Sequence, residues 1–266
     1  MRYVLLFLIP LLLWTQKPDL LLLETYKDQN ISGWVMSEKL DGVRAYWTGK
    51  ALISRGGYVI HAPESFTKGF PPFELDGELS TKRGDFNHIS SVVRDAVPSG
   101  EWSEVTYHIF EVPHVQGGLV ERLQKVKPYE SKILKIIPQI KIRSKRHMQV
   151  FLKSIESEGG EGVVVRDPTV AYIAKRTSKA LKVKTFQDAE CKVEEYVKGK
   201  GKYKDVMGAL KCRLSNGIQI KIGSGFSDEE RKNPPAIGTE ITFKYKELTK
   251  NGKPRFPVFI RVREAF

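Results

Sequence analysis

The stretch Ser37-Glu38-Lys39-Leu40-Asp41-Gly42-Val43-Arg44 decides how the first part of the chain is interpreted. Residues 33–40 and 45–54 have the composition of strands, and Asp41-Gly42 is a turn signal between them. A lysine becomes a nucleophile only after it loses its proton, and a nearby cation such as Arg44, or burial, lowers its pKa. Lys39 is therefore a candidate nucleophile, although the stretch alone also fits a solvated hairpin turn.

A second cluster, residues 74–79 (Glu-Leu-Asp-Gly-Glu-Leu), alternates acidic and apolar residues. In a strand, this period of two places Glu74, Asp76 and Glu78 on one face. Such a face repels itself unless it meets a cation, which predicts a Mg²⁺ site. The alternative is an acidic strand that faces solvent.

Two further clusters combine charge with strand patterning. Glu161 lies between glycines and opens the apolar run 162–166, where glycine allows a ligand or backbone to approach closely. Lys182 and Lys184 are two residues apart, so in a strand they point to the same side and suit a phosphate-bearing ligand. A helix stop before a core strand, and a solvated strand edge, are the respective alternatives.

The residue patterns along the sequence predict an α+β protein with two domains. Residues 17–187 mix strands with a helix that is indicated by the spacing of Met148, Phe151, Leu152 and Ile155. Residues 188–266 contain five short alternating runs, at 191–197, 209–214, 218–222, 241–245 and 258–262. Five such strands favour a small β-barrel of the OB-fold type.

The amino terminus has the features of a leader. The apolar run Val4–Trp14 fits the core of a signal peptide and is too short to cross a bilayer, so residues 1–16 are a candidate signal peptide. A periplasmic location follows as an expectation, with the cytoplasm as the alternative. We expect Cys191 and Cys212 to be isolated thiols, although an oxidising compartment would let them pair.

The balance of charge points to a polyanionic partner. Lys and Arg number 44 against 31 Asp and Glu, which gives +13. Four lysines stand in the stretch 198–204, Lys198, Lys200, Lys202 and Lys204, and a flexible Gly-Lys loop suits contact with a nucleic-acid backbone. A solvated charged loop is the alternative.

In order and spacing, these clusters resemble the covalent nucleotidyltransferases, and most closely the small ATP-dependent DNA ligases of bacteria, a subset of which carries a periplasmic leader. Lys39–Arg44 is similar to motif I (Lys-x-Asp-Gly-x-Arg). The other similarities are Ser54–Gly57 to motif Ia, Asp76–Leu79 to motif III, Phe110-Glu111 to motif IIIa, Glu161–Val164 to motif IV, Lys182–Lys184 to motif V and Arg255–Glu264 to motif VI. In motif IIIa the usual acid is Asp. Motif VI departs further, because Arg261-Val262-Arg263-Glu264 replaces Arg-x-Asp-Lys. The resemblance implies a nucleotidyltransferase (ATP-grasp-like) domain followed by an OB-fold domain.

The resemblance also implies a three-step reaction with ATP and Mg²⁺, for which Mn²⁺ can substitute. Lys39 takes AMP from ATP, AMP passes to the 5′-phosphate of a nick in duplex DNA, and the 3′-hydroxyl then displaces it. The expected partner is nicked double-stranded DNA. The protein is expected to be a monomer with no stable membrane association once the leader is removed.

Roles follow from the motif positions. Glu78 and Glu161 are expected to hold the metal, Lys182 and Lys184 to neutralise phosphate charge, and Asp41 to lie near the 3′-hydroxyl. The remaining nucleotide contacts are expected from Glu38, Leu40, Arg44, Phe110 stacked on adenine, and Arg261, with Arg263 as the second choice for motif VI. Arg44 and Arg55 are expected to hold the 5′-phosphate or the DNA backbone, together with the lysines of 198–204.

Two other functions remain open at this point. An RNA ligase or a GTP-dependent capping enzyme shares the lysine motif. A non-catalytic nucleic-acid-binding protein would explain the charge and the barrel, but not the spacing of Lys39, Glu78, Glu161 and the Lys182/Lys184 pair.

Overall fold

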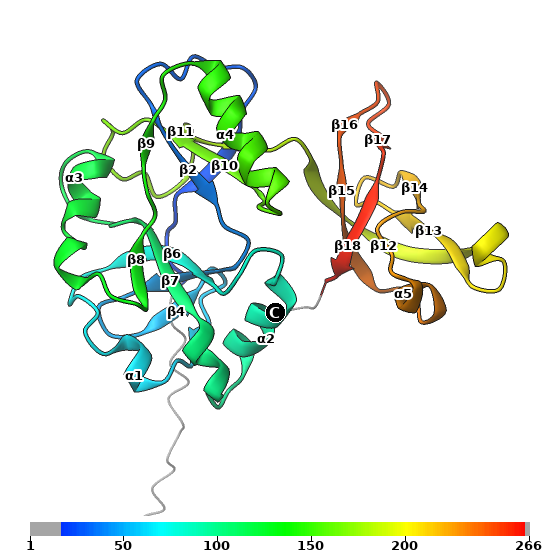
Figure 1. The fold of residues 1–266 in the computed structure, drawn as a ribbon, viewed down its shortest axis with the longest axis horizontal. Coiled ribbons are helices and arrows are strands. Elements are labelled where there is room, and N and C mark those ends of the chain that lie inside the picture. Colours follow the sequence, from blue (N-terminus) through cyan, green and yellow to red (C-terminus); the bar gives the residue numbers. More distant parts are fainter. Residues whose placement is uncertain (1–16, 264–266) are drawn as a thin grey trace, which may run out of the picture. The chain divides into compact units, whose positions relative to one another are not determined.

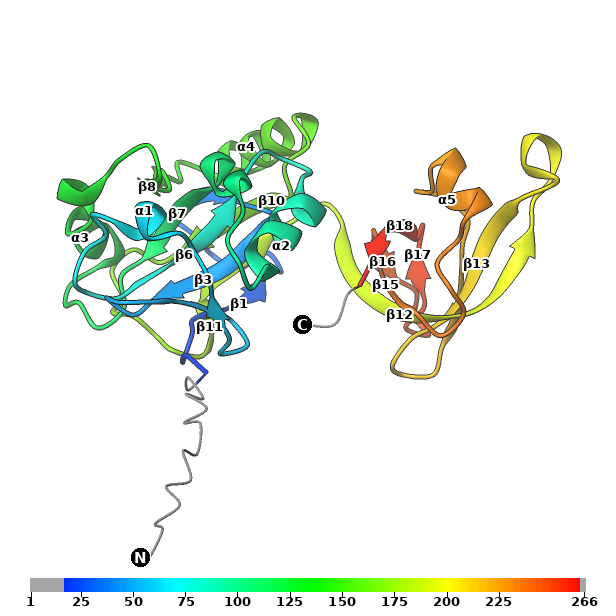
Figure 2. The same cartoon turned by 90° about the horizontal axis from the view of Figure 1, so that it is seen from below.

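The computed structural model describes residues 17–263 and divides them into two compact units, shown in Figures 1 and 2. The units divide in the chain between Val183 and Lys184, slightly before the boundary predicted at 187/188. The leader predicted at residues 1–16 lies outside the described residues. Across 17–263, none of the helices combines the length and hydropathy needed to cross a membrane.

One sheet of the first unit carries the lysine strand (Figure 1). Its strands, in spatial order, are β1 (Leu22–Thr25), β11 (Arg176–Val183), β10 (Gly162–Arg166), β2 (Val35–Lys39) and β9 (Ile140–Lys141). All neighbours are antiparallel except β1 and β11. Helix α4 (Lys145–Ser157) packs Met148, Leu152 and Ile155 against the apolar face of this sheet.

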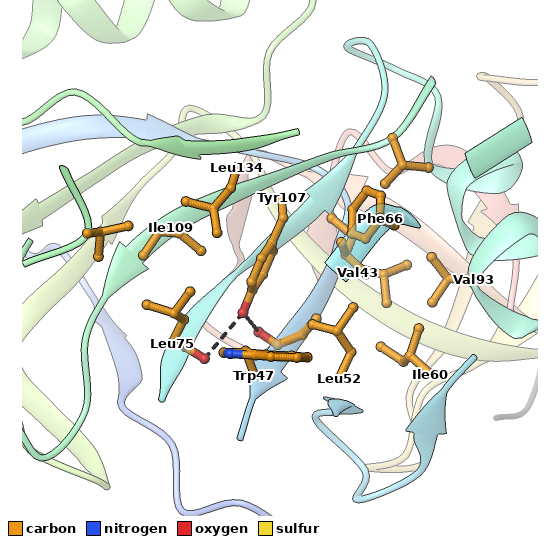
Figure 3. Close-up of a cluster of buried hydrophobic side chains, with 14 of the residues drawn as sticks. Val43, Trp47, Leu52, Ile60, Phe66, Leu75, Val93, Tyr107, Ile109 and Leu134 are labelled. Carbon is orange, nitrogen blue, oxygen red and sulfur yellow. Dashed lines mark hydrogen bonds between the residues drawn. The ribbon is translucent and has the colours of Figure 1, made fainter. Parts of the chain in front are cut away.

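The second sheet of this unit carries the acidic strand. Its strands, in spatial order, are β5 (Val59–Ile60), β4 (Leu52–Ser54), β3 (Val43–Trp47), β6 (Leu75–Ser80), β7 (Thr106–Glu111) and β8 (Leu134–Ile136). Buried side chains cover one face, and the Tyr107 hydroxyl donates to the carbonyls of Ala45 and Leu75 there (Figure 3). Helices α1 (Glu64–Thr67), α2 (Phe86–Arg94) and α3 (Leu119–Gln124), with 3-10 turns at Gly100–Glu104 and Lys127–Tyr129, contribute to this core or adjoin it.

The two strands that flank the lysine stretch do not form a hairpin with each other. β2 pairs with β10 and β9, whereas β3 pairs with β4 and β6 in the other sheet. The chain crosses between the sheets at residues 40–42, where a Cβ on Gly42 would lie 2.2 Å from the carbonyl oxygen of Leu79. Glycine is therefore required at this close approach, and the crossing places Lys39 and Arg44 on different sheets.

The second unit is a closed barrel, as the alternating runs predicted. Its sheet has the spatial order β14 (Gln219–Ile222), β13 (Met207–Arg213), β12 (Gln187–Lys198), β15 (Glu240–Tyr245) and β18 (Val258–Val262). A parallel bridge from Ser224, just beyond β14, to Val258 of β18 closes it. Helix α5 (Asp228–Lys232), a 3-10 turn (Gly201–Tyr203) and the hairpin of β16 (Glu247–Leu248) and β17 (Pro254–Arg255) complete this unit. This connectivity is that of an OB-fold, and it confirms the predicted fold class.

The expectation of two isolated thiols is wrong. Cys191 on β12 and Cys212 on β13 form a disulfide, with their Cα atoms 5.6 Å apart. β12 and β13 are adjacent antiparallel strands, and both cysteines point into the apolar core of the barrel. Sequence alone cannot assign this pair, because a separation of 21 residues leaves the pairing of the two strands open.

Candidate active site

The nucleophile candidate lies at the end of a strand and is held by an ion pair. Lys39 is the last residue of β2, and the antiparallel register places it opposite Gly162 of β10. Glu161 precedes Gly162, and its Oε2 accepts a hydrogen bond from Lys39 Nζ at 2.5 Å. Both side chains are mostly buried, with exposed fractions of 24% and 19%. The structure therefore joins two predicted site residues that are far apart in sequence.

Glu78 lies on the facing sheet within the electrostatic reach of this pair. On β6 it is flanked by Arg44 of β3 and His108 of β7. Burial raises the pKa of Glu78 to about 8, against the attraction of Lys39 and Arg44. A cation next to a buried carboxyl group stabilises its ionised form and lowers its pKa again. Glu78 is therefore a favourable position for binding a cation.

Arg44 is bound inside the protein. Its Nε and Nη2 donate to the two carboxylate oxygens of Asp76 at 2.9 and 2.6 Å, and Asp76 is completely buried. The guanidinium also lies 5.3 Å from the ring centroid of Phe110, within cation–π distance. Asp76 therefore orients Arg44, whereas Glu78 on the same strand interacts electrostatically with Lys39 and Glu161.

The acid after Phe110 holds the two sheets together. Glu111 is fully buried and accepts two hydrogen bonds from Arg122 of α3, at 2.7 and 2.8 Å, and another from Arg166 of β10. Arg166 also donates to the carbonyl of Phe110 at 2.6 Å. Burial alone would raise the pKa of Glu111, but the charges of Arg166 and Arg122 lower it. The longer acid at this motif IIIa position is thus a structural anion that fixes the backbone of Phe110.

A cavity of about 530 Å³ is lined by Glu161 and by the two residues that flank Lys39. Its wall includes Ser80 at the end of β6 and the following loop Thr81–Gly84, together with Glu38, Leu40, Asp41, His108, Gly159, Gly160 and Glu161. Burial lowers the pKa of His108, so that it is neutral at physiological pH and can accept a hydrogen bond. None of the sequence motifs contains this loop or His108. The run of hydroxyl and basic residues after the acidic strand is the signal that could have revealed the loop.

Other predicted residues lie in varied surroundings. Lys182 is on β11 opposite Val164 of β10, and Lys184, just after β11, pairs with Asp188 at 2.6 Å. Arg55 is exposed in the turn that follows β4. In the barrel, Arg261 lies on β18 opposite Thr242. The lysines at 198, 200, 202 and 204 are exposed. Among them, Lys202 forms an ion pair with Asp228 at 3.0 Å.

The donors for a metal are few. Within residues 17–263, no three His, Cys, Asp or Glu side chains gather as a cation site. Glu78 and Glu161 supply carboxylate oxygens only, which suits Mg²⁺, because this ion commonly binds one or two protein carboxylates and completes its shell with water and substrate phosphates.

This fold and site define a nucleotidyltransferase of the two-domain type. The first unit has two sheets and a mostly buried lysine in an ion pair, and an OB barrel follows. A DNA ligase of Haemophilus influenzae is 47% identical over 250 residues, which cover 92% of this chain and 92% of that protein. The chain belongs to the DNA ligase family, and the predicted family is confirmed.

Family and structure comparisons agree with this assignment. Residues 198–263 match the family model of the DNA ligase OB-like domain. A structure from a study of Lig E DNA ligases, concerned with DNA binding by a minimal scaffold, is 38% identical, covers 92% of this chain and 98% of its own, and has a TM-score of 0.63. Chlorella virus DNA ligase-adenylate is 25% identical, with 94% and 99% coverage and a TM-score of 0.54.

Glu111→Gln tests the anchor between the sheets. The substitution keeps the shape but leaves Arg122 and Arg166 without a counter-charge, so the first unit should lose about 3 kcal/mol of unfolding free energy. Tryptophan fluorescence during denaturant unfolding reports on this unit, because all four tryptophans precede residue 184. The exposed pair Lys145–Asp28 of the same unit supplies the control, and Lys145→Gln should have a much smaller effect. Equal effects of the two changes would contradict the anchoring role.

Proposed function

We propose that this DNA ligase is ATP-dependent and seals nicks in duplex DNA through AMP bound covalently to Lys39. The observation that carries the proposal is the Lys39 amine in a partly buried cleft, 2.5 Å from Glu161 and close to Glu78. A related solved structure is a DNA ligase-adenylate, which supports adenylate as the transferred group.

In the first step, Nζ of Lys39 attacks the α-phosphorus of ATP. A P–N bond forms, the bond from the α-phosphorus to the bridging oxygen breaks, and pyrophosphate leaves with its electron pair. Lys39 must lose a proton to attack, and Glu161 orients the amine through its hydrogen bond. Lys182 and Lys184 stabilise the charge on the phosphates, and Arg261 of the barrel is the motif VI candidate for pyrophosphate.

The adenosine is held by the facing sheet. Phe110 lies on β7, and Arg166 fixes its backbone carbonyl by a hydrogen bond. Its ring would stack on adenine after the Arg44 guanidinium moves off the ring. Leu40 and Asp41 form the cavity wall directly after Lys39. Mg²⁺, with Mn²⁺ as a substitute, would be held by Glu78 and Glu161 and would neutralise phosphate charge.

In the second and third steps, AMP passes to the 5′-phosphate of the nick, and the 3′-hydroxyl then forms the phosphodiester bond while AMP leaves. Asp41 on the cavity wall is the group assigned to the 3′-hydroxyl end. Arg55 is exposed and available to DNA, whereas Arg44 would have to exchange Asp76 for a phosphate. These contacts involve phosphates and carry no sequence information, as a ligase for any nick requires.

We also propose that the protein is exported to the periplasm. The disulfide between Cys191 and Cys212 supports this, because such bonds persist in oxidising compartments. The apolar run at Val4–Trp14 provides the matching leader in the sequence.

Lys39→Ala should abolish both the covalent adenylate and nick sealing, because the substitution removes the amine that forms the P–N bond. Intact-mass spectrometry after incubation with ATP and Mg²⁺ measures the adduct, and a nicked duplex measures sealing. Lys153→Ala, on the exposed face of α4, is the matched control and should keep both activities. An adduct that persists without Lys39 would rule the proposal out. Nicked RNA and GTP, offered in parallel, distinguish RNA ligase and capping activities.

The loop of residues 198–204 should contribute to DNA affinity through charge alone. Replacing Lys198, Lys200 and Lys204 by Gln should reduce the slope of log K against log salt by about 0.9 for each DNA phosphate that is no longer neutralised. Fluorescence anisotropy with a nicked duplex measures the slope. The control triple Lys68, Lys125 and Lys132→Gln removes the same charge from exposed positions of the first unit that carry no predicted role. Identical slopes for both triples would remove the loop from the DNA interface.

The exported protein should contain no titratable thiol before reduction and two afterwards, because its cysteines are paired. Replacing both by Ser should lower the unfolding free energy of the barrel by about 3 kcal/mol. Thiol titration in denaturant and amino-terminal sequencing of periplasmic protein are the measurements. Two free thiols on a cytoplasmic protein that retains Met1 would refute export.

A further inference from the structure

Arg83 joins two carboxylates from different parts of the fold. Its Nε and Nη2 donate to Oε1 and Oε2 of Glu38 at 2.8 and 2.9 Å, and its Nη1 donates to Oε2 of Glu158 at 2.5 Å. All three nitrogens of the guanidinium therefore have a carboxylate partner. The motif position of Glu38 predicts a nucleotide contact, but in the structure its carboxylate is occupied by Arg83.

The residues joined by Arg83 each adjoin a group of the proposed active site. Glu38 immediately precedes Lys39 on β2, and Glu158 lies at the end of α4, three residues before Glu161. Arg83 itself lies in the loop after β6, the strand that carries Glu78. One guanidinium thus connects the three chain segments that carry Lys39, Glu78 and Glu161.

The backbone is closely fitted around this connection. A Cβ on Gly160 would lie 3.2 Å from Oε1 of Glu38 and 2.4 Å from a methyl carbon of Ile155. A side chain at position 160 would therefore crowd Ile155 in the tight turn that follows α4. This turn lies beside the carboxylate of Glu38, and a single planar guanidinium reaches both Glu38 and Glu158.

We infer that Arg83 is a positioning residue for adenylyl transfer, which sets the distance between Lys39 and Glu161 by holding Glu38 and Glu158. The inference rests on the proposed function and adds a residue outside the nucleotide-binding motifs. Lysine cannot replace arginine here, because a single ammonium lacks the fork that binds one carboxylate with two nitrogens and reaches another with the third.

The position of Arg83 makes this role testable without loss of the fold. The side chains of Arg83, Glu38 and Glu158 are 32%, 20% and 61% exposed, so solvent screens part of this network and its loss should leave the fold intact. The rate of the reaction is more sensitive than stability to the loss of Arg83, because small displacements of reacting groups can slow the reaction by about 10- to 100-fold. A positioning role therefore appears mainly in the rate of the chemical step, with a much smaller effect on the unfolding free energy.

The experiment is single-turnover adenylylation of the full chain at several ATP concentrations. Arg83→Gln and Glu38→Gln should each slow the saturated rate by about tenfold, with little change in the ATP concentration at half-saturation. The double variant should be no slower than the single ones, because both changes break the same ion pair. Arg83→Lys should remain slow, and Glu158→Gln should have a smaller effect than Arg83→Gln. Arg213→Gln breaks a similar exposed pair with Glu194 in the barrel and is the control.

A wild-type rate for Arg83→Gln, full rescue by lysine, or independent effects of Arg83→Gln and Glu38→Gln would overturn the inference. A raised half-saturating concentration for Glu38→Gln at an unchanged saturated rate would make Glu38 an ATP contact and overturn it as well. If a substitution at Arg83 prevents folding, as judged by tryptophan fluorescence, then wild-type rates for both Glu38→Gln and Glu158→Gln overturn it. Absence of an adduct on the unsubstituted protein would instead refute the proposed function.

Discussion

The buried carboxylate of Glu111 is the interaction on which the arrangement of the two sheets depends. Glu111 lies on β7 and accepts hydrogen bonds from Arg122 of α3 and Arg166 of β10. A charge removed from water needs such partners, and each partner here comes from a different element. The polar faces of the sheets are thereby held close enough for Lys39, Glu161 and Glu78 to interact.

Paired charges organise the rest of the cleft. Lys39 is held by Glu161, Arg44 by Asp76, and Arg83 by Glu38 and Glu158. A cleft that binds a polyphosphate must hold many cations, and acidic partners prevent these from repelling one another before the substrate arrives. In the proposed reaction, substrate phosphates would replace some of these acidic partners. Glu78 differs, because burial leaves it with a raised pKa and a preference for an added cation.

Local pattern was sufficient for several elements and insufficient for others. The apolar run at 162–166 is the strand β10, and the spacing of Met148, Leu152 and Ile155 marks the apolar face of α4. The alternating runs after residue 188 correspond to the barrel strands. By contrast, α2 was not predicted, although its buried residues Ile89, Val92 and Val93 have helical spacing. The position of the loop after β6 was not predicted, and the disulfide was predicted wrongly, because both depend on contacts between segments distant in the chain.

The sequence by itself determined the identity and order of the chemical groups, since the motifs from Lys39 to Lys184 are local and their spacing is characteristic of the family. It also determined the alternation that forms the barrel, because side-chain direction in a strand has a period of two. Only the tertiary structure decided that β2 and β3 belong to different sheets, that Glu111 lies between two arginines, and that Arg83 reaches Glu38 and Glu158. The physical reason is that these are contacts between residues far apart in the chain, and their geometry is set by strand pairing and burial, which no local pattern encodes.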